Sequence, residues 1–162
     1  MLFLLVNCAI LLRQNKTLWG ENCLLKKILF GGESGLSPQA NAGLALLRIF
    51  AGVSLLMAHG LGKIPPSEQF VARTAEFGFP APAFFAWSAA LSESLGGALL
   101  ALGLFTRIAS FFIICTMLTA LIFVHFADPY KQQELAFMYL FVALAFFIKG
   151  SGDWSVDAFF RK

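Results

Sequence analysis

Residues 108–127 read IASFFIICTMLTALIFVHFA, a run of 20 residues that contains no Asp, Glu, Lys or Arg. An α-helix rises about 1.5 Å per residue, so a helix of this length crosses the hydrocarbon core of a bilayer, which is about 30 Å thick. The run therefore predicts a transmembrane helix.

Further apolar segments lie on both sides of this run, at residues 42–61, 83–105 and 135–148. The last is short, but Asp128 and Pro129 form an N-cap and first-turn signal that extends the predicted helix to 129–149. In lipid every backbone polar group needs a partner within its own segment, and the sequence lacks the short alternating strands of a barrel. We predict an all-α fold, a four-transmembrane-helix bundle in which a very short turn at Arg107 joins the second and third helices as an antiparallel hairpin.

The composition also predicts a membrane protein. Hydrophobic residues make up 59% of the 162-residue chain and charged residues 13%, against about a quarter charged in a soluble chain. The net charge of +3 comes from scattered residues with no run longer than Lys26-Lys27, so the expected partner is the lipid bilayer and not nucleic acid. Cys8, Cys23 and Cys115 form no C-x-x-C pair and no metal-ligand spacing, so we expect neither a dithiol centre nor a metal site, and Cys115 is expected in the core.

The segment between the first two predicted spans has a pattern of its own. Pro65, Pro66 and Ser67 end one helix and can begin another, which would continue to Gly78. Apolar residues such as Phe70 recur there at helical spacing, opposite charged ones. This pattern predicts a short interfacial helix on the membrane surface, and an ordinary capped loop is the alternative.

Residues 1–40 are predicted to form an N-terminal extension of the membrane domain, which we place at residues 41–162. Residues 1–12 are apolar but too short to cross a bilayer, and they lack the basic region and cleavage site of a signal peptide. They fit an interfacial anchor or a segment with little fixed structure, and residues 31–35 fit a flexible linker.

Five ionisable residues lie inside the predicted spans: Arg48, His59, Glu93, His125 and Glu134. A charged group at the bilayer centre costs about 2.5 to 3.5 kcal/mol on insertion scales, so these side chains should face one another and not the lipid. All five, together with Lys63 at the end of the first span, are candidates for ligand binding or proton handling. With both histidines neutral the five charges sum to minus one, which predicts that the group retains a proton.

Helical geometry groups some of these residues. Arg48 and His59 are 11 residues apart, within about 20° of one helix face, and Lys63 continues that face toward the helix end. Glu93 shares its face with small residues including Gly96 and Gly97, which let helices approach closely. We therefore expect Glu93 to point toward the first helix.

Two other interpretations of the ionisable residues stay open. Arg48, Glu93 and Glu134 can act as polar glue between helices. His59 and His125 with a carboxylate can ligate a metal, or the two histidines can hold a haem, although no local spacing supports either arrangement.

Several stretches, in order, resemble the DoxX family of small four-helix membrane proteins. They are LRIFAGVSLLMAHGLGK at 47–63, ESLGGALLALGLFTR at 93–107, the residues His125 and Glu134, and GSGDWSVD at 150–157. The last is similar to the family's terminal G-x-G-x-x-S-hydrophobic-Asp, and the whole resemblance covers residues 42–160. It transfers no catalytic role, but it places these residues at motif positions: Arg48, His59, Lys63, Glu93, Arg107, Glu134 and Asp157.

The resemblance implies a redox link, because the family name is shared with subunits of a thiosulfate:quinone oxidoreductase and some relatives belong to membrane-associated redox or thiol-stress complexes. We therefore expect a redox-linked protein of the bacterial inner membrane that binds a quinone-like or other small ligand in a polar interior. No hydride or electron carrier motif is present, so electrons would come from a bound cofactor or a redox partner protein. The alternatives are a non-enzymatic accessory or assembly subunit and a small-solute or proton transporter.

The distribution of basic residues predicts the orientation. With four spans the two termini share a side with the Arg107 turn, and that side carries eight Lys and Arg residues. The other side carries three, namely Lys63, Arg73 and Lys131. Both termini are therefore expected in the cytoplasm.

Cysteine labelling tests this orientation. In a cysteine-free background, single cysteines that replace Lys131 and Lys162 should differ in their reaction with an impermeant thiol reagent added from outside, because they lie on opposite sides. Equal labelling from outside would contradict the predicted topology.

Overall fold

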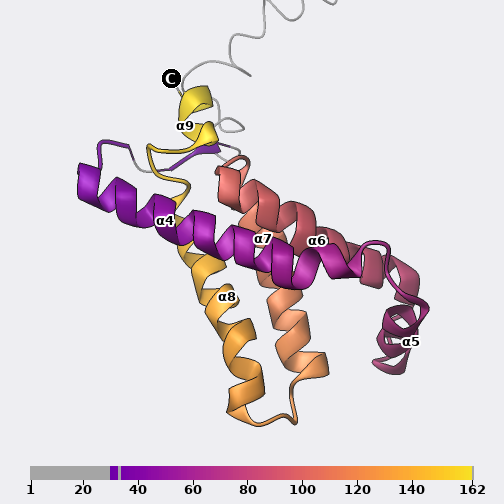
Figure 1. Ribbon diagram of the computed structural model, residues 1–162. Helices are drawn as coiled ribbons and strands as arrows, with labels where there is room; N and C mark the ends of the chain where they lie inside the picture. Colours follow the sequence, from indigo (N-terminus) through magenta and orange to yellow (C-terminus); the bar gives the residue numbers. More distant parts are fainter. Residues whose placement is uncertain (1–29, 33, 162) are drawn as a thin grey trace, which may run out of the picture.

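The computed structural model describes residues 30–32 and 34–161, and in that part of the chain all regular secondary structure is helical (Figure 1). Four helical stretches are long and apolar enough to cross a membrane: Pro38–Lys63, Pro82–Leu102, Thr106–Val124 and Tyr130–Lys149. The four predicted spans are therefore confirmed. Most of the predicted N-terminal extension, residues 1–29, lies outside the described residues.

The first and third spans each end in a change of helix type. The elements, in order, are α4 (Pro38–Leu55), the π-helix η1 (Leu56–Gly60), the 3-10 turn η2 (Leu61–Lys63), α5 (Glu68–Glu76), α6 (Pro82–Leu102), α7 (Thr106–Thr119), the π-helix η3 (Ala120–Val124), α8 (Tyr130–Lys149) and α9 (Val156–Arg161).

Local capping explains where several helices begin. The Ser37 hydroxyl accepts a hydrogen bond from the amide of Ala40 at 3.2 Å, and Pro38 occupies the first turn of α4. Ser67 caps α5 in the same way, so the predicted helix between the first two spans is confirmed, while its position on the membrane surface stays a prediction. The predicted cap at Asp128 is wrong, because α8 begins after Pro129 without a side-chain cap.

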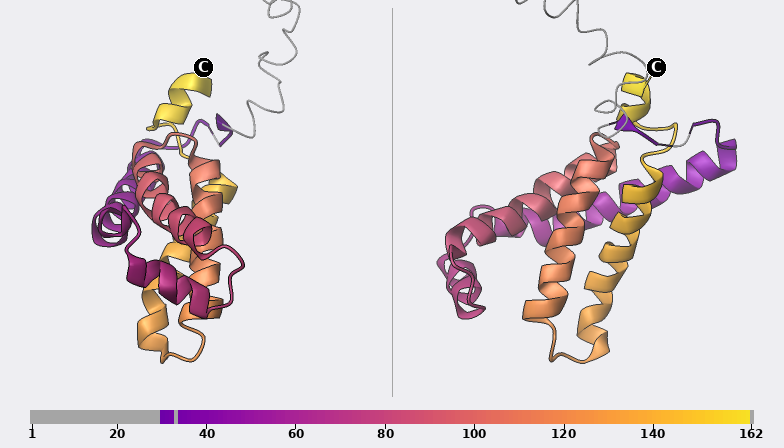
Figure 2. Two further views of the ribbon diagram at one scale, coloured as in Figure 1. Left: turned by 90° about the vertical axis from the view of Figure 1, so that its right-hand side faces the viewer. Right: turned by 180° about the vertical axis from the view of Figure 1, so that it is seen from behind.

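The short turn between α6 and α7 confirms the predicted hairpin. Gly103 ends α6 with a φ of 68°, in the left-handed region that favours glycine, and α7 begins at Thr106. The two helices meet at this turn and diverge toward α5 (Figures 1 and 2).

Two helix pairs make up the membrane domain. α4 packs along α6, α7 packs along α8, and the first pair is steeply inclined to the second (Figures 1 and 2). The apolar core at the crossing draws on all four spans, through Leu55, Leu100, Ile113, Met117, Leu121, Leu140, Ala143 and Phe146.

The α4–α6 contact depends on two glycines. A Cβ atom on Gly52 would lie 2.6 Å from the carbonyl oxygen of Gly97, and one on Gly97 would lie 2.9 Å from that of Gly52. The expected close approach of the second span to the first at Gly97 is thus confirmed. Gly96 instead faces α7, where its Cβ would lie 3.4 Å from the Ile113 side chain.

Replacing Gly52 with Ala should destabilise the protein by about 1 to 3 kcal/mol, because the added methyl overlaps backbone atoms that cannot move aside cheaply. Gly43→Ala is the matched control, since a Cβ there meets nothing within 4 Å. Thermal unfolding in detergent measures both variants. Equal melting temperatures for the two would contradict the close packing.

The chain after α8 folds back onto the α6–α7 turn, and we call residues 150–161 the C-terminal clasp. The Asp157 carboxylate accepts hydrogen bonds from the amides of Phe105, at 2.8 Å, and Thr106, at 3.0 Å. The Asp157 amide donates to the carbonyl oxygen of Gly103 at 2.8 Å. Phe105 has no side-chain acceptor, so the start of α7 is capped by a residue from the far end of the chain.

A second carboxylate attaches the clasp to the start of α4. The Asp153 side chain accepts hydrogen bonds from the Asn41 side chain and from the amides of Leu36 and Gly35, at 3.1 to 3.2 Å. The hydrogen bond from Asn41, followed by those from the two amides and the nearby charge of Arg161, lowers the pKa of Asp153 although burial opposes the shift. The Asp153 side chain is therefore ionised at neutral pH and can accept all three hydrogen bonds.

Asp157→Asn should destabilise the protein by about 1 to 3 kcal/mol, because the asparagine side chain has one acceptor oxygen and the amide of Phe105 or of Thr106 loses its partner. Glu134→Gln is the matched control, since that carboxylate is exposed on α8. Both variants can be compared by thermal unfolding in detergent. An Asp157→Asn protein as stable as the control would show that the clasp does not cap α7.

Candidate functional site

A cleft of about 720 Å³ lies where α6 and α7 diverge, and α5 contributes to its wall. Its apolar lining is mainly aromatic, from Phe70, Phe77, Phe79, Phe85 and Phe112. Its polar lining comes from Lys63, Arg73, Thr74, Glu76, Ser88, Glu93, Thr116, Thr119 and His125. Lys63, Glu93 and His125 are thus the three predicted site residues that line one cavity.

An ion pair between two of these residues places a buried carboxylate in the cleft lining. Lys63 Nζ lies 2.5 Å from Glu93 Oε2, with the Glu93 side chain 7% exposed and the Lys63 side chain 33% exposed. The Lys63 ammonium also lies 5.5 Å from the ring centroid of Phe70, within the range of a cation–π contact. Lys63 therefore joins α5 to the buried carboxylate of α6.

His125 follows η3, and its imidazole is held by a local network. Its Nδ1 lies 2.7 Å from the Asp128 carboxylate, which explains why Asp128 does not cap α8. The Gln133 side chain donates at 2.8 Å to the carbonyl oxygens of both His125 and Asp128. This network fixes the turn that carries the imidazole into the cleft lining.

Arg48 lies away from the cleft, in contact with the C-terminal clasp. Its side chain donates at 2.9 Å to the carbonyl oxygens of Ser151 and Trp154, and the residue is only 2% exposed. Asp157 is close enough to attract its charge. A Cβ on Gly103 would overlap the guanidinium, so this position needs glycine for space as well as for its backbone angle. Arg48 therefore holds the clasp and does not pair with Glu93.

The other two candidates are also separate. The His59 ring packs edge-on against the Tyr139 ring, with centroids 5.9 Å apart, and does not line the cleft. Glu134 is exposed on α8. The π-helix η1 and the 3-10 turn η2 change the number of residues per turn, so the predicted common face of Arg48, His59 and Lys63 does not form.

The expectation of one five-residue cluster is therefore wrong, and the sum of minus one does not describe a single site. Glu93 is neutralised by Lys63, and Arg48 lies near Asp157. Within residues 30–32 and 34–161, no three His, Cys, Asp or Glu side chains are grouped so that they could hold a metal ion.

Sequence reasoning missed part of the cleft. Cys115, expected in the core, is exposed and lines the cleft together with Thr116 and Thr119 from α7. Arg73 lines it from α5. The two threonines and the cysteine fall within an otherwise apolar span, and this small polar content was the available signal.

The fold and site define a multi-pass helical membrane protein with an aromatic cleft and an ion pair within it. The family model DoxX matches residues 43–126, and the chain belongs to that family. The chain is similar to the Bacillus subtilis (strain 168) protein named "Putative oxidoreductase CatD", with 30% identity over 121 residues, which are 74% of this chain and 88% of that protein. No solved structure matches the chain.

Proposed function

We propose that the protein is a redox-linked component of the bacterial inner membrane and that its cleft binds a quinone-like small molecule. The observation that carries this proposal is the Lys63–Glu93 ion pair, which lies in the lining of a Phe-rich cavity within a membrane domain. The name of the relative as an oxidoreductase supports a redox role.

The chemistry of the lining suits a quinone. Its volume of about 720 Å³ is within the usual range for small-molecule sites, about 300 to 1,000 Å³. The Phe rings of the lining can pack against the ring and the apolar tail of a quinone. Offset or edge-on contact between aromatic rings adds stabilisation beyond the area that they bury. An ammonium group has three N–H donors, so Lys63 can keep its bond to Glu93 and still donate to a quinone carbonyl.

Protons and electrons would come from different sources. In this proposal Glu93 and His125 are the groups of the cleft that can exchange protons with a bound ligand. The electrons come from a bound cofactor or a redox partner protein. With both termini in the cytoplasm, the cleft lies toward the outer side of the membrane, since Lys63 and Arg73 belong to the side with fewer basic residues.

A competing role for the ion pair is purely structural. Lys63 connects η2, α5 and α6, so the pair can hold these elements together in an accessory subunit that binds no small molecule. The two roles differ in whether a ligand reaches the cleft, and the free thiol of Cys115 in the lining reports on that directly.

Protection of Cys115 tests the proposal. In a Cys8→Ser, Cys23→Ser background, decylubiquinone should slow the alkylation of Cys115 by N-ethylmaleimide, because the bound ring covers the thiol. Its fully substituted ring does not itself add a thiol. Glu93→Gln should raise the concentration needed for half protection by about tenfold, because the Lys63 ammonium loses the charged partner that positions it toward the ligand and with it the worth of about one hydrogen bond to a charged group.

Glu134→Gln is the control, because it removes an exposed carboxylate outside the cleft and should leave protection unchanged. Absence of protection in the parent protein, together with a lower melting temperature for Glu93→Gln, would favour the structural role. Equal protection in the parent and Glu93→Gln proteins would separate the ligand from the ion pair and contradict the proposed site.

A further inference from the structure

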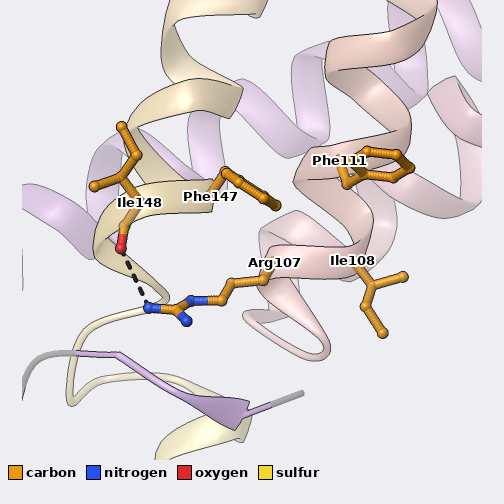
Figure 3. Close-up of a pocket in the computed structure, with 5 residues that line it drawn as sticks. All are labelled: Arg107, Ile108, Phe111, Phe147 and Ile148. Carbon is orange, nitrogen blue, oxygen red and sulfur yellow. Dashed lines mark hydrogen bonds between the residues drawn. The ribbon is translucent and has the colours of Figure 1, made fainter. Parts of the chain in front are cut away.

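A second cavity, of about 510 Å³, lies between the start of α7 and the end of α8, apart from the cleft (Figure 3). Ile108, Phe111, Phe147 and Ile148 form its apolar walls, and Arg107 lies at one end. The rings of Phe111 and Phe147 pack against each other in its wall, tilted by 38° with centroids 6.4 Å apart. We call this cavity the Arg107 groove.

The position of the groove across the membrane suits a lipid. Arg107 is in the first turn of α7 and Ile148 in the last turn of α8, so both lie where the spans end and headgroups begin. Phe111 is four residues further along α7, about 6 Å deeper. The groove therefore runs from headgroup level into the hydrocarbon region.

The guanidinium of Arg107 has unused hydrogen-bonding capacity. Of its five N–H donors, Nη2 donates a hydrogen bond to the carbonyl oxygen of Ile148 at 3.2 Å (Figure 3). Its Nε atom is buried without a partner. Among the residues that the structure describes, no carboxylate lies within ion-pair distance of Arg107.

The surrounding charge favours an anion. The nearby carboxylates of the clasp are engaged, with Asp157 bonded to the α7 amides and Asp153 bonded to Asn41. A planar guanidinium matches the oxygens of a phosphate in a two-pronged arrangement, and basic pockets between spans are suited to anionic lipid headgroups.

We propose that the Arg107 groove binds an anionic phospholipid, with its phosphate at Arg107 and one acyl chain lying along the rings of Phe111 and Phe147. The headgroup contact supplies preference for an anionic lipid, and the aromatic walls supply the apolar contact area. This site is separate from the proposed quinone cleft, since the two cavities share no lining residue.

Native mass spectrometry of the purified full chain tests the site, with dioleoylphosphatidylglycerol and dioleoylphosphatidylcholine as probes. The wild-type protein should retain the anionic lipid preferentially. Arg107→Gln should weaken its binding by about tenfold, which corresponds to one charge-assisted hydrogen bond. Lys131→Gln, which removes one exposed positive charge at the opposite end of α8, should leave the preference unchanged.

The apolar half of the site has its own matched pair. Phe111→Ala should weaken the binding of both lipids, whereas Phe141→Ala, which removes an exposed ring outside the groove, should not.

Arg107→Lys keeps the positive charge and replaces Arg107→Gln if that variant fails to fold. It should reduce the preference for the anionic lipid partially. Equal retention of the two lipids by the wild type, or identical retention by Phe111→Ala and Phe141→Ala, would overturn the proposal. A dimer that excludes lipid from the groove would also overturn it.

Discussion

A guanidinium group buried within a membrane span needs hydrogen-bond acceptors, and much of this structure follows from meeting that need. Arg48 finds two backbone carbonyls, those of Ser151 and Trp154, which the chain can supply only by folding back after α8. The same reversal brings Asp157 to the first amides of α7. A buried charge on the first span is thus satisfied by the last part of the chain, and that part completes the start of the third span.

The contacts that hold α6 and α7 together at their shared turn also explain why the two helices diverge at the other end. The clasp and the short α6–α7 turn hold these helices together on one side, and the Gly52–Gly97 contact keeps α6 along α4. Because α6 follows the inclined α4 while α7 follows α8, the two helices separate with distance from the turn (Figure 2). α5 lies beside the resulting space, so the cleft arises from helix directions that are set elsewhere.

The sequence was sufficient for the spans but not for the pairing of charges. Apolar runs of about 20 residues predict helices well, because lipid leaves the backbone no other solution at that length. Glu93 was correctly directed toward the first helix, since Gly97 allows close approach on that face. Arg48 was misplaced because its acceptors are main-chain carbonyls, which side-chain identity does not reveal. His59 and Lys63 were predicted on the wrong face of the helix because η1 and η2 change the number of residues per turn. No residue type in that stretch predicts a π-helix.

Under the proposed function, the Lys63–Glu93 ion pair both stabilises the cleft and lets it respond to a ligand. A carboxylate as buried as Glu93 is tolerated because the Lys63 ammonium lies against it, yet Lys63 is itself one-third exposed and contacts the ring of Phe70. A ligand that draws the ammonium toward its own oxygen would leave Glu93 less compensated, and a proton would restore neutrality. Ligand binding and proton uptake would then be coupled through one ion pair, without any movement of Arg48 or the clasp. Such coupling requires an ammonium that a ligand can reach, which the one-third exposed Lys63 permits and the enclosed Arg48 does not.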